Sequence, residues 1–61
     1  MKPVVKLVGE DGNVFNVIGR VSRSLNNLGM RKEAEEFKEK AFSARSYDEV
    51  LQLAMEYCEV E

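Results

Sequence analysis

Hydrophobic positions recur at helical spacing through the first half of the chain. Between positions 14 and 28 they are Val14, Val17, Ile18, Val21, Leu25 and Leu28. These side chains share one helical face, an arc of about 100°, and this pattern predicts a helix over 14–28. Asn13 can cap its start with the side-chain oxygen. Gly29 can end it in the left-handed conformation, with Met30 beyond it contacting Leu25.

A β-hairpin is the alternative for the start of this segment. Asp11-Gly12 is typical of a two-residue hairpin turn, and it lies between the apolar segments 4–8 and 14–18. Residues 14–18 could then form a strand that pairs with the segment before the turn. We favour the helix because the apolar period continues to Leu28.

A second helix is predicted over 30–43. Its apolar face holds Met30, Ala34, Phe37 and Ala41, with Phe42 beside it. The outer side carries opposite charges four residues apart, as in Glu36 and Lys40, which supports an exposed helical face.

A third helix is predicted from Ser46 to about Cys58. Ser46 and Glu49 have the spacing of a capping box, and Asp48 places negative charge in the first turn, where the helix dipole favours it. Only residues 44–46 separate this helix from the preceding one, so we expect a sharp turn between the two.

The N-terminal segment 3–8 is typical of a strand, because it is mostly β-branched and Pro3 stands at its start. The glycine-rich segment 9–13 then predicts a turn. A single strand cannot satisfy its own backbone groups, so it must pair with the chain end, pair with another chain or remain an edge.

The last residues, 58–61, alternate apolar and acidic side chains, which permits a short C-terminal strand. If this segment pairs with the N-terminal strand, Lys2 and Lys6 could face Glu59 and Glu61 across the ladder. The predicted fold is therefore a small α+β domain in which an N-terminal strand is followed by three helices, and the sequence permits a short C-terminal strand.

Length and composition limit the kind of protein. We expect residues 1–61 to form one small domain, and 44% hydrophobic with 33% charged residues is typical of a folded chain. Cys58 is the only cysteine, which excludes an intrachain disulfide, and the chain has no His and no carboxylate spacing that suggests a metal site. Stability must therefore come from packing or self-association.

The chain also lacks the sequence signatures of several functional classes. No phosphate-binding loop or nucleophile and base pair is present, so we expect no enzyme, no cofactor and no metal. No apolar run is long enough to span a membrane or to form a signal-peptide core, and we expect a cytoplasmic protein without a membrane partner.

The charges are divided between the two halves of the chain. Residues 1–32 carry six Lys or Arg and two Asp or Glu, whereas residues 33–61 carry three Lys or Arg and nine Asp or Glu. Such a division concerns partners and association rather than fold. It favours head-to-tail or strand-complementary association of opposite charges.

The positive half forms a stripe on the predicted first helix. The candidate nucleic-acid contacts are Asn16, Arg20, Arg23 and Asn27 on that stripe, with Arg31 and Lys32 just after it. Arg and Asn side chains contact phosphates and base edges. The alternative is a solvated face that pairs with acids of the same fold. Aromatic residues are absent from the stripe, which counts against binding of single strands by stacking.

The third helix points instead to a protein contact. Its apolar side chains sweep about 200°, more than one buried face requires. Leu51 and Met55 at one margin, and Val4 and Lys6 on the strand edge, are therefore candidate interface residues, with burial under the strand and tail as the alternative for the helical pair. The favoured function is a non-enzymatic interaction module that binds a protein or itself, and a nucleic-acid accessory protein is the alternative.

The segment Val5–Asn13, with its Val-Gly-Glu-Asp-Gly-Asn core, resembles a group of short uncharacterised bacterial proteins met in phage and other mobile-element contexts. Three further segments share the resemblance: Ile18-Gly19-Arg20-Val21, Ser46-Tyr47-Asp48 and Tyr57. It covers most of the chain and implies a small standalone protein with nothing catalytic.

Overall fold

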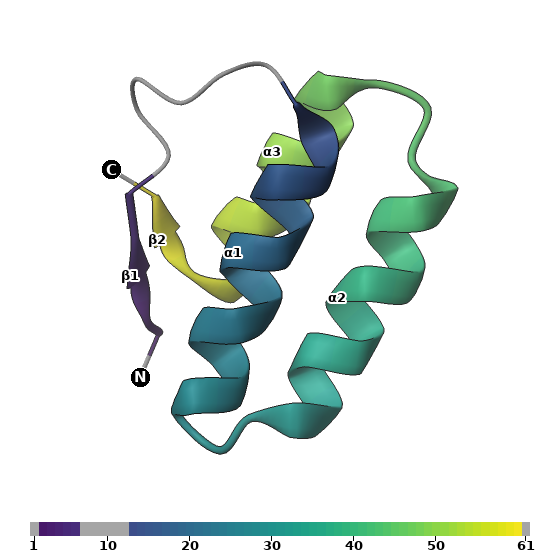
Figure 1. Cartoon of the computed structure of the whole chain (residues 1–61). Coiled ribbons are helices and arrows are strands. Elements are labelled where there is room, and N and C mark those ends of the chain that lie inside the picture. Colours follow the sequence, from purple (N-terminus) through teal and green to yellow (C-terminus); the bar gives the residue numbers. More distant parts are fainter. Residues whose placement is uncertain (1, 7–12, 61) are drawn as a thin grey trace.

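The computed structural model describes residues 2–6 and 13–60. The elements are β1 (Val4–Val5), α1 (Val14–Asn27), α2 (Arg31–Ser43), α3 (Tyr47–Tyr57) and β2 (Glu59–Val60). Helices α1 and α2 lie side by side, α3 packs behind α1, and the two short strands lie together at one side of the bundle (Figure 1). This arrangement confirms the predicted small α+β fold with its short C-terminal strand.

The start of α1 shows that the helix prediction was right for residues 14–18 and that the hairpin alternative is wrong. Asn13 Oδ1 accepts a hydrogen bond of 2.9 Å from the Phe15 N–H, which satisfies one of the free donors of the first turn. Val17 and Ile18 are both buried. A strand would point two successive side chains to opposite faces, whereas a helix places both against the core. The predicted turn at 9–12 lies outside the described residues.

The end of α1 is a Schellman motif, in which two backbone N–H groups bond back into the last turn. Gly29 takes a φ of 77°, and its N–H donates to the Asn26 carbonyl at 2.9 Å. The Met30 N–H donates to the Leu25 carbonyl, also at 2.9 Å. Met30 then packs against the core, of which Leu25 is a member.

The second helix begins at Arg31, one residue later than predicted, and buries Ala34, Phe37 and Ala41. The outer charges are arranged differently from the prediction. Lys38 and Glu35 form an ion pair of 3.3 Å at i, i+3. Lys40 donates a hydrogen bond to Tyr57 of α3 rather than forming an ion pair with Glu36 within 4.0 Å.

A capping box consists of two hydrogen bonds, and the first of them is present at the start of α3 as the sequence predicted. Ser46 Oγ accepts from the Glu49 N–H at 3.2 Å. The other half is shifted by one residue, because Glu49 Oε1 accepts from the Arg45 N–H at 3.4 Å instead of the Ser46 N–H. The helix ends at Tyr57, with Cys58 as its C-cap.

The core joins all three helices to β1. Its buried apolar residues are Val5, Val17, Ile18, Val21, Leu25, Ala34, Phe37, Ala41, Val50, Ala54 and Cys58. Ser22 of α1 is also buried, at 7% exposure, and its hydroxyl has no hydrogen-bond partner among the residues described. This orphaned hydroxyl costs stability, since a desolvated polar group without a partner is unfavourable.

The two strands pair in parallel. Val4 lies opposite Glu59 and Val5 opposite Val60, and the Glu59 N–H donates to the Pro3 carbonyl at 2.8 Å. Among the described residues the first strand is shorter than the predicted 3–8.

We predicted that Lys2 and Lys6 could lie opposite acidic residues across the ladder. For Glu59 this prediction was wrong, because the register places Val4 opposite it. The ammonium of Lys2 instead donates to the Met55 carbonyl at 3.4 Å. Residues 7, 8 and 61 lie outside the described part of the chain.

Candidate interaction surface

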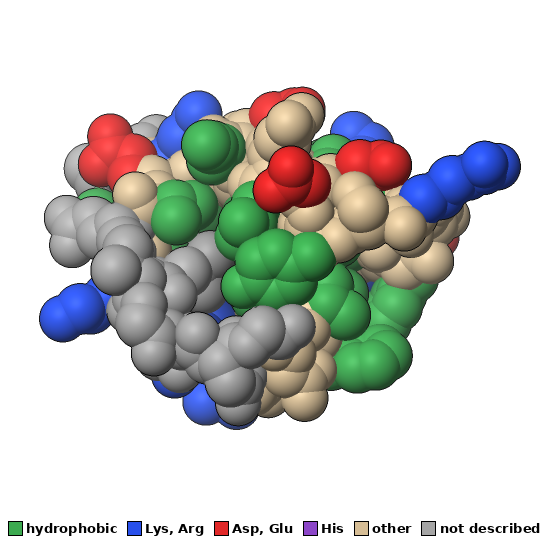
Figure 2. Space-filling model, turned by 90° about the horizontal axis from the view of Figure 1, so that it is seen from above, with side chains coloured by type: hydrophobic (Ala, Val, Ile, Leu, Met, Phe, Trp, Pro, Cys, Tyr) green, Lys and Arg blue, Asp and Glu red, His purple; other side chains and the backbone are tan. Residues whose placement is uncertain are grey.

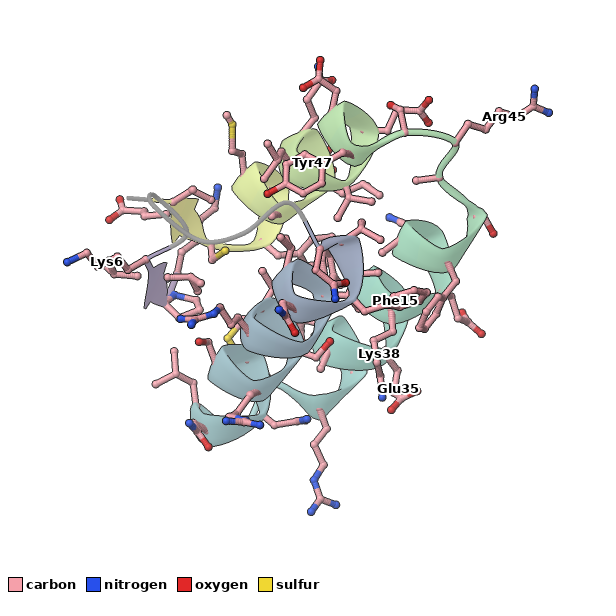
Figure 3. The ribbon with its side chains drawn as sticks, turned by 45° about the horizontal axis from the view of Figure 1, so that its top comes forward. Lys6, Phe15, Glu35, Lys38, Arg45 and Tyr47 are labelled. Carbon is pink, nitrogen blue, oxygen red and sulfur yellow. The ribbon has the colours of Figure 1, made fainter. Side chains whose placement is uncertain are left out.

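Two large aromatic side chains are exposed side by side at one end of the bundle. Phe15 of α1 is 66% exposed and Phe42 of α2 is 63% exposed. Their ring centroids lie 6.3 Å apart at an interplanar angle of 41°, and Phe15 points toward α2 (Figure 3). Such a pair is a notable feature of a small domain, because isolated apolar side chains are common on protein surfaces and clusters of them are not.

A groove of about 440 Å³, the aromatic groove, lies beside this pair. Phe15 and Phe42 form part of its wall, together with Tyr47 and Val50 of α3 and with Arg45 from the link between α2 and α3. Hydrophobic side chains gather on this end of the molecule (Figure 2), and Arg45 points away from the body of the domain (Figure 3). The groove is thus an apolar hollow with a cation at its rim.

A second groove of about 540 Å³, the cationic groove, lies between β1 and α1. Its described lining includes Lys6 after β1 and Arg20, Arg23 and Asn16 of α1, and it includes no Asp or Glu. Phe15 lines this groove as well as the aromatic one. We call the two grooves and the exposed pair together the Phe15 surface.

The Phe15 surface combines residues that the sequence assigned to separate sites. Lys6 was predicted for a protein interface, whereas Arg20 and Arg23 were predicted for nucleic acid. The stripe itself has no aromatic residue, as the sequence indicated, but the exposed Phe15 lines the same groove as Arg20 and Arg23. Position 15 lies about 100° from position 14 on the helix, outside the apolar arc, so a large apolar residue at this position was the sequence signal for an exposed aromatic side chain.

The remaining predicted contacts lie elsewhere. Asn27, Arg31 and Lys32 are exposed near the turn between α1 and α2 and do not line the cationic groove among the described residues. The chain reverses direction at Gly29, so Arg31 and Lys32 lie at the start of α2 and not on the face of α1 that lines the groove.

The predicted interface residues are divided by the fold. Val4 is exposed and lines the cationic groove with Lys6. Met55 is 55% exposed, whereas Leu51 is half-buried and packs against the core. Neither Leu51 nor Met55 lines either groove of the Phe15 surface.

A third groove, the acidic groove, lies between α2 and α3 and has a volume of about 560 Å³. Glu39, Glu49 and Glu56 line it, with Lys40 as a single cation and half-buried Leu53 as an apolar part of its lining. The Lys40 ammonium bonds to the Tyr57 hydroxyl. The groove therefore presents an excess of negative charge.

Other kinds of site find no residues in the described part of the chain. No group of three or more His, Cys, Asp or Glu side chains there is placed to hold a metal ion. No helix among those residues has the length and apolar character that crossing a membrane requires. Cys58 is a free buried thiol whose pKa is raised by desolvation, with a smaller opposing effect from Lys2.

The three grooves and the exposed aromatic pair are the features on which function can be argued. Comparison of the chain with protein-family models, curated proteins and solved structures found no match.

Proposed function

We propose that this protein is a non-enzymatic interaction module that binds another protein through the Phe15 surface. The observation that carries this proposal is the contact of Phe15 with Phe42 while both rings are more than half exposed. Burying an aromatic side chain contributes about 1.5–3 kcal/mol. A partner that covers both rings therefore gains the kind of central apolar anchor that dominates protein interfaces.

The surroundings of the aromatic pair support the same proposal. Phe15 and Phe42 belong to helices that pack against each other, so their positions are held by the core rather than by a loop. Arg45 at one side and Arg23 at the other provide a polar rim, which is the usual arrangement around a buried interface centre.

The proposal is tested by immobilising the wild-type chain and a Phe15→Ser/Phe42→Ser variant. Leu28→Ser is the matched control, because Leu28 is 51% exposed and lines neither groove of the Phe15 surface. Each form is incubated with a bacterial lysate and, separately, with the untagged chain. We expect proteins retained by the wild type and the control to fall about tenfold or more on the double variant.

The proposal fails if all three forms retain the same proteins in the same amounts. Circular dichroism of each form checks that the helices are intact. Exposed side chains contribute little to the core, so we expect the helical signal of the double variant to equal that of the wild type.

A second candidate function, binding of single-stranded nucleic acid, is favoured by the composition of the cationic groove. Lys6 and Arg23 can meet phosphates while Phe15 stacks on a base, which is the usual combination for single strands. Fluorescence anisotropy with a labelled oligonucleotide at low salt tests it. Binding must weaken in an Arg20→Ala/Arg23→Ala variant and persist in Arg31→Ala. An equal signal for both variants removes this candidate.

A further inference from the structure

We propose that the partner of the Phe15 surface is a second copy of this chain, bound head to tail through its acidic groove. The inference rests on the proposed function, since it names the occupant of the same surface. The first observation is charge. The described lining of the cationic groove holds Lys6 and Arg23 and no acid, whereas the acidic groove holds Glu39, Glu49 and Glu56 against Lys40.

The charge of the acidic groove is only partly compensated by the described residues of the fold. Among the described residues, Glu39 and Glu56 form no ion pair within 4.0 Å, and Glu49 accepts from the Arg45 backbone N–H. The single cation of that groove, Lys40, donates to the Tyr57 hydroxyl and also interacts electrostatically with Glu56, so one positive charge stands against three negative charges. Opposite potentials on two surfaces steer their encounter and set their register.

The apolar parts of the two surfaces also match. The Phe15 ring stands exposed at the edge of the cationic groove, and Leu53 forms an apolar part of the lining of the acidic groove. Insertion of the ring against Leu53 surrounds one apolar contact with opposite charges. An aromatic anchor enclosed by a polar rim is the arrangement that gives protein interfaces most of their binding energy.

The positions of the grooves determine the form of the assembly. The cationic groove is built from β1 and α1, the acidic groove from α2, α3 and their link, and the two share no described residue. Figure 1 shows β1 and α2 on opposite sides of α1. One copy can therefore bind a neighbour through each groove at once. Such a heterologous contact builds chains or closed rings rather than a symmetric dimer.

Sedimentation velocity over a concentration series of the full chain tests the inference. Arg23→Glu removes the charge match from one side of the contact, and Glu56→Ala removes it from the other. We expect the wild type to form species larger than a dimer, and each variant alone to associate at least about tenfold more weakly. Arg31→Glu is the control, because Arg31 lines neither groove, and it must associate like the wild type.

An equimolar mixture of the two variants gives the decisive measurement. Arg23→Glu keeps an intact acidic groove and Glu56→Ala keeps an intact cationic groove, so the mixture must restore association through one contact. The two substitutions create no opposite charges that could pair with each other, so association must stop at a complex of one copy of each. Raising the salt from about 50 mM to about 500 mM must weaken both this complex and the wild-type assembly, because ions screen exposed charges.

The inference is overturned if the wild type remains monomeric at every concentration, or if the mixed variants do not form the capped complex. Binding of a single-stranded oligonucleotide by a monomeric wild type, lost in Arg23→Glu, overturns it in favour of nucleic acid. The proposed function fails by a different result, namely equal protein retention by the wild type and the Phe15→Ser/Phe42→Ser variant. The two failures are therefore distinguishable.

Discussion

The ammonium of Lys40 donates a hydrogen bond of 3.0 Å to the hydroxyl of Tyr57 and lies 5.5 Å from the centroid of the same ring. The ring also meets Phe37 in an edge-to-face contact, with the centroids 5.6 Å apart. Phe37 is fully buried at the centre of the core. Tyr57 of α3 therefore contacts both an exposed cation and a buried ring of α2. These two contacts hold α3 against α2.

Removing the two contacts of Tyr57 one after the other should lower the stability of the protein in two steps. Tyr57→Phe keeps the ring against Phe37 and loses only the hydroxyl, so we expect a small decrease in the free energy of unfolding. Tyr57→Leu also loses the aromatic pair, which contributes about 0.5–1.5 kcal/mol beyond its buried area. Urea denaturation measures both. Equal stability of the two variants would show that the ring contact contributes nothing.

The same pair predicts a dependence of stability on high pH. The hydrogen bond from Lys40 to Tyr57 is the main cause that raises the pKa of Lys40 above its usual value of 10.5. A pKa raised by folding stabilises the native state below the unfolded value, and this contribution is lost as the pH rises through the folded value. The stability difference between the wild type and Lys40→Met should therefore be constant near neutral pH and shrink above 10.5. A difference that grows in that range contradicts the assignment.

The fold was predictable from the sequence where the signals are local. Asn13, Gly29 and Ser46 each set a helix boundary through bonds to residues within a few positions, and such bonds depend little on the rest of the chain. The apolar period likewise decided the face of α1 that is buried. The strand register could not be predicted in this way, because the packing of the three helices determines where the C-terminal residues lie relative to β1.

The Phe15 surface was not predictable for the same reason. Phe15 and Phe42 are separated by most of two helices, and their contact follows from the packing of α1 against α2. Lys6 and Arg23 meet in one groove only because β1 lies beside α1. Period and charge patterns describe single elements, whereas these sites are made by pairs of elements.

Replacing Ser22 by Ala should stabilise the protein. The Ser22 hydroxyl is buried without a hydrogen-bond partner among the described residues, so its removal relieves a desolvation cost, and Ala is also the better helix former. We expect the free energy of unfolding to rise by about 1 kcal/mol. Ser24→Ala is the control on the same helix, where only the propensity gain of roughly 0.5 kcal/mol applies. An equal gain for both would remove the role of the buried hydroxyl.

The same substitution at two glycines should have opposite effects. Gly19 lies within α1, and a Cβ there meets no described atom within 4 Å, so Gly19→Ala should stabilise the helix by about 0.5–1 kcal/mol. Gly29 ends α1 with a φ of 77°, and Gly29→Ala should cost about 1–2 kcal/mol because the left-handed region is unfavourable for a residue with a Cβ. Thermal denaturation of both variants checks the two signs. A gain at Gly29 contradicts the Schellman ending.

Cys58 offers a probe of how the C-terminal elements open. Its side chain is 1% exposed, its thiol donates to the Ala54 carbonyl at 3.0 Å, and desolvation raises its pKa, so both access and the thiolate fraction are low in the folded state. Reaction with a disulfide reagent at neutral pH should therefore be at least about 100-fold slower than in the unfolded chain, since it requires local or global opening. Replacing Val5, which packs in the same core, by Ala should speed the reaction by loosening that core. A fast reaction in the native wild type would mean that β2 and the end of α3 do not cover the thiol.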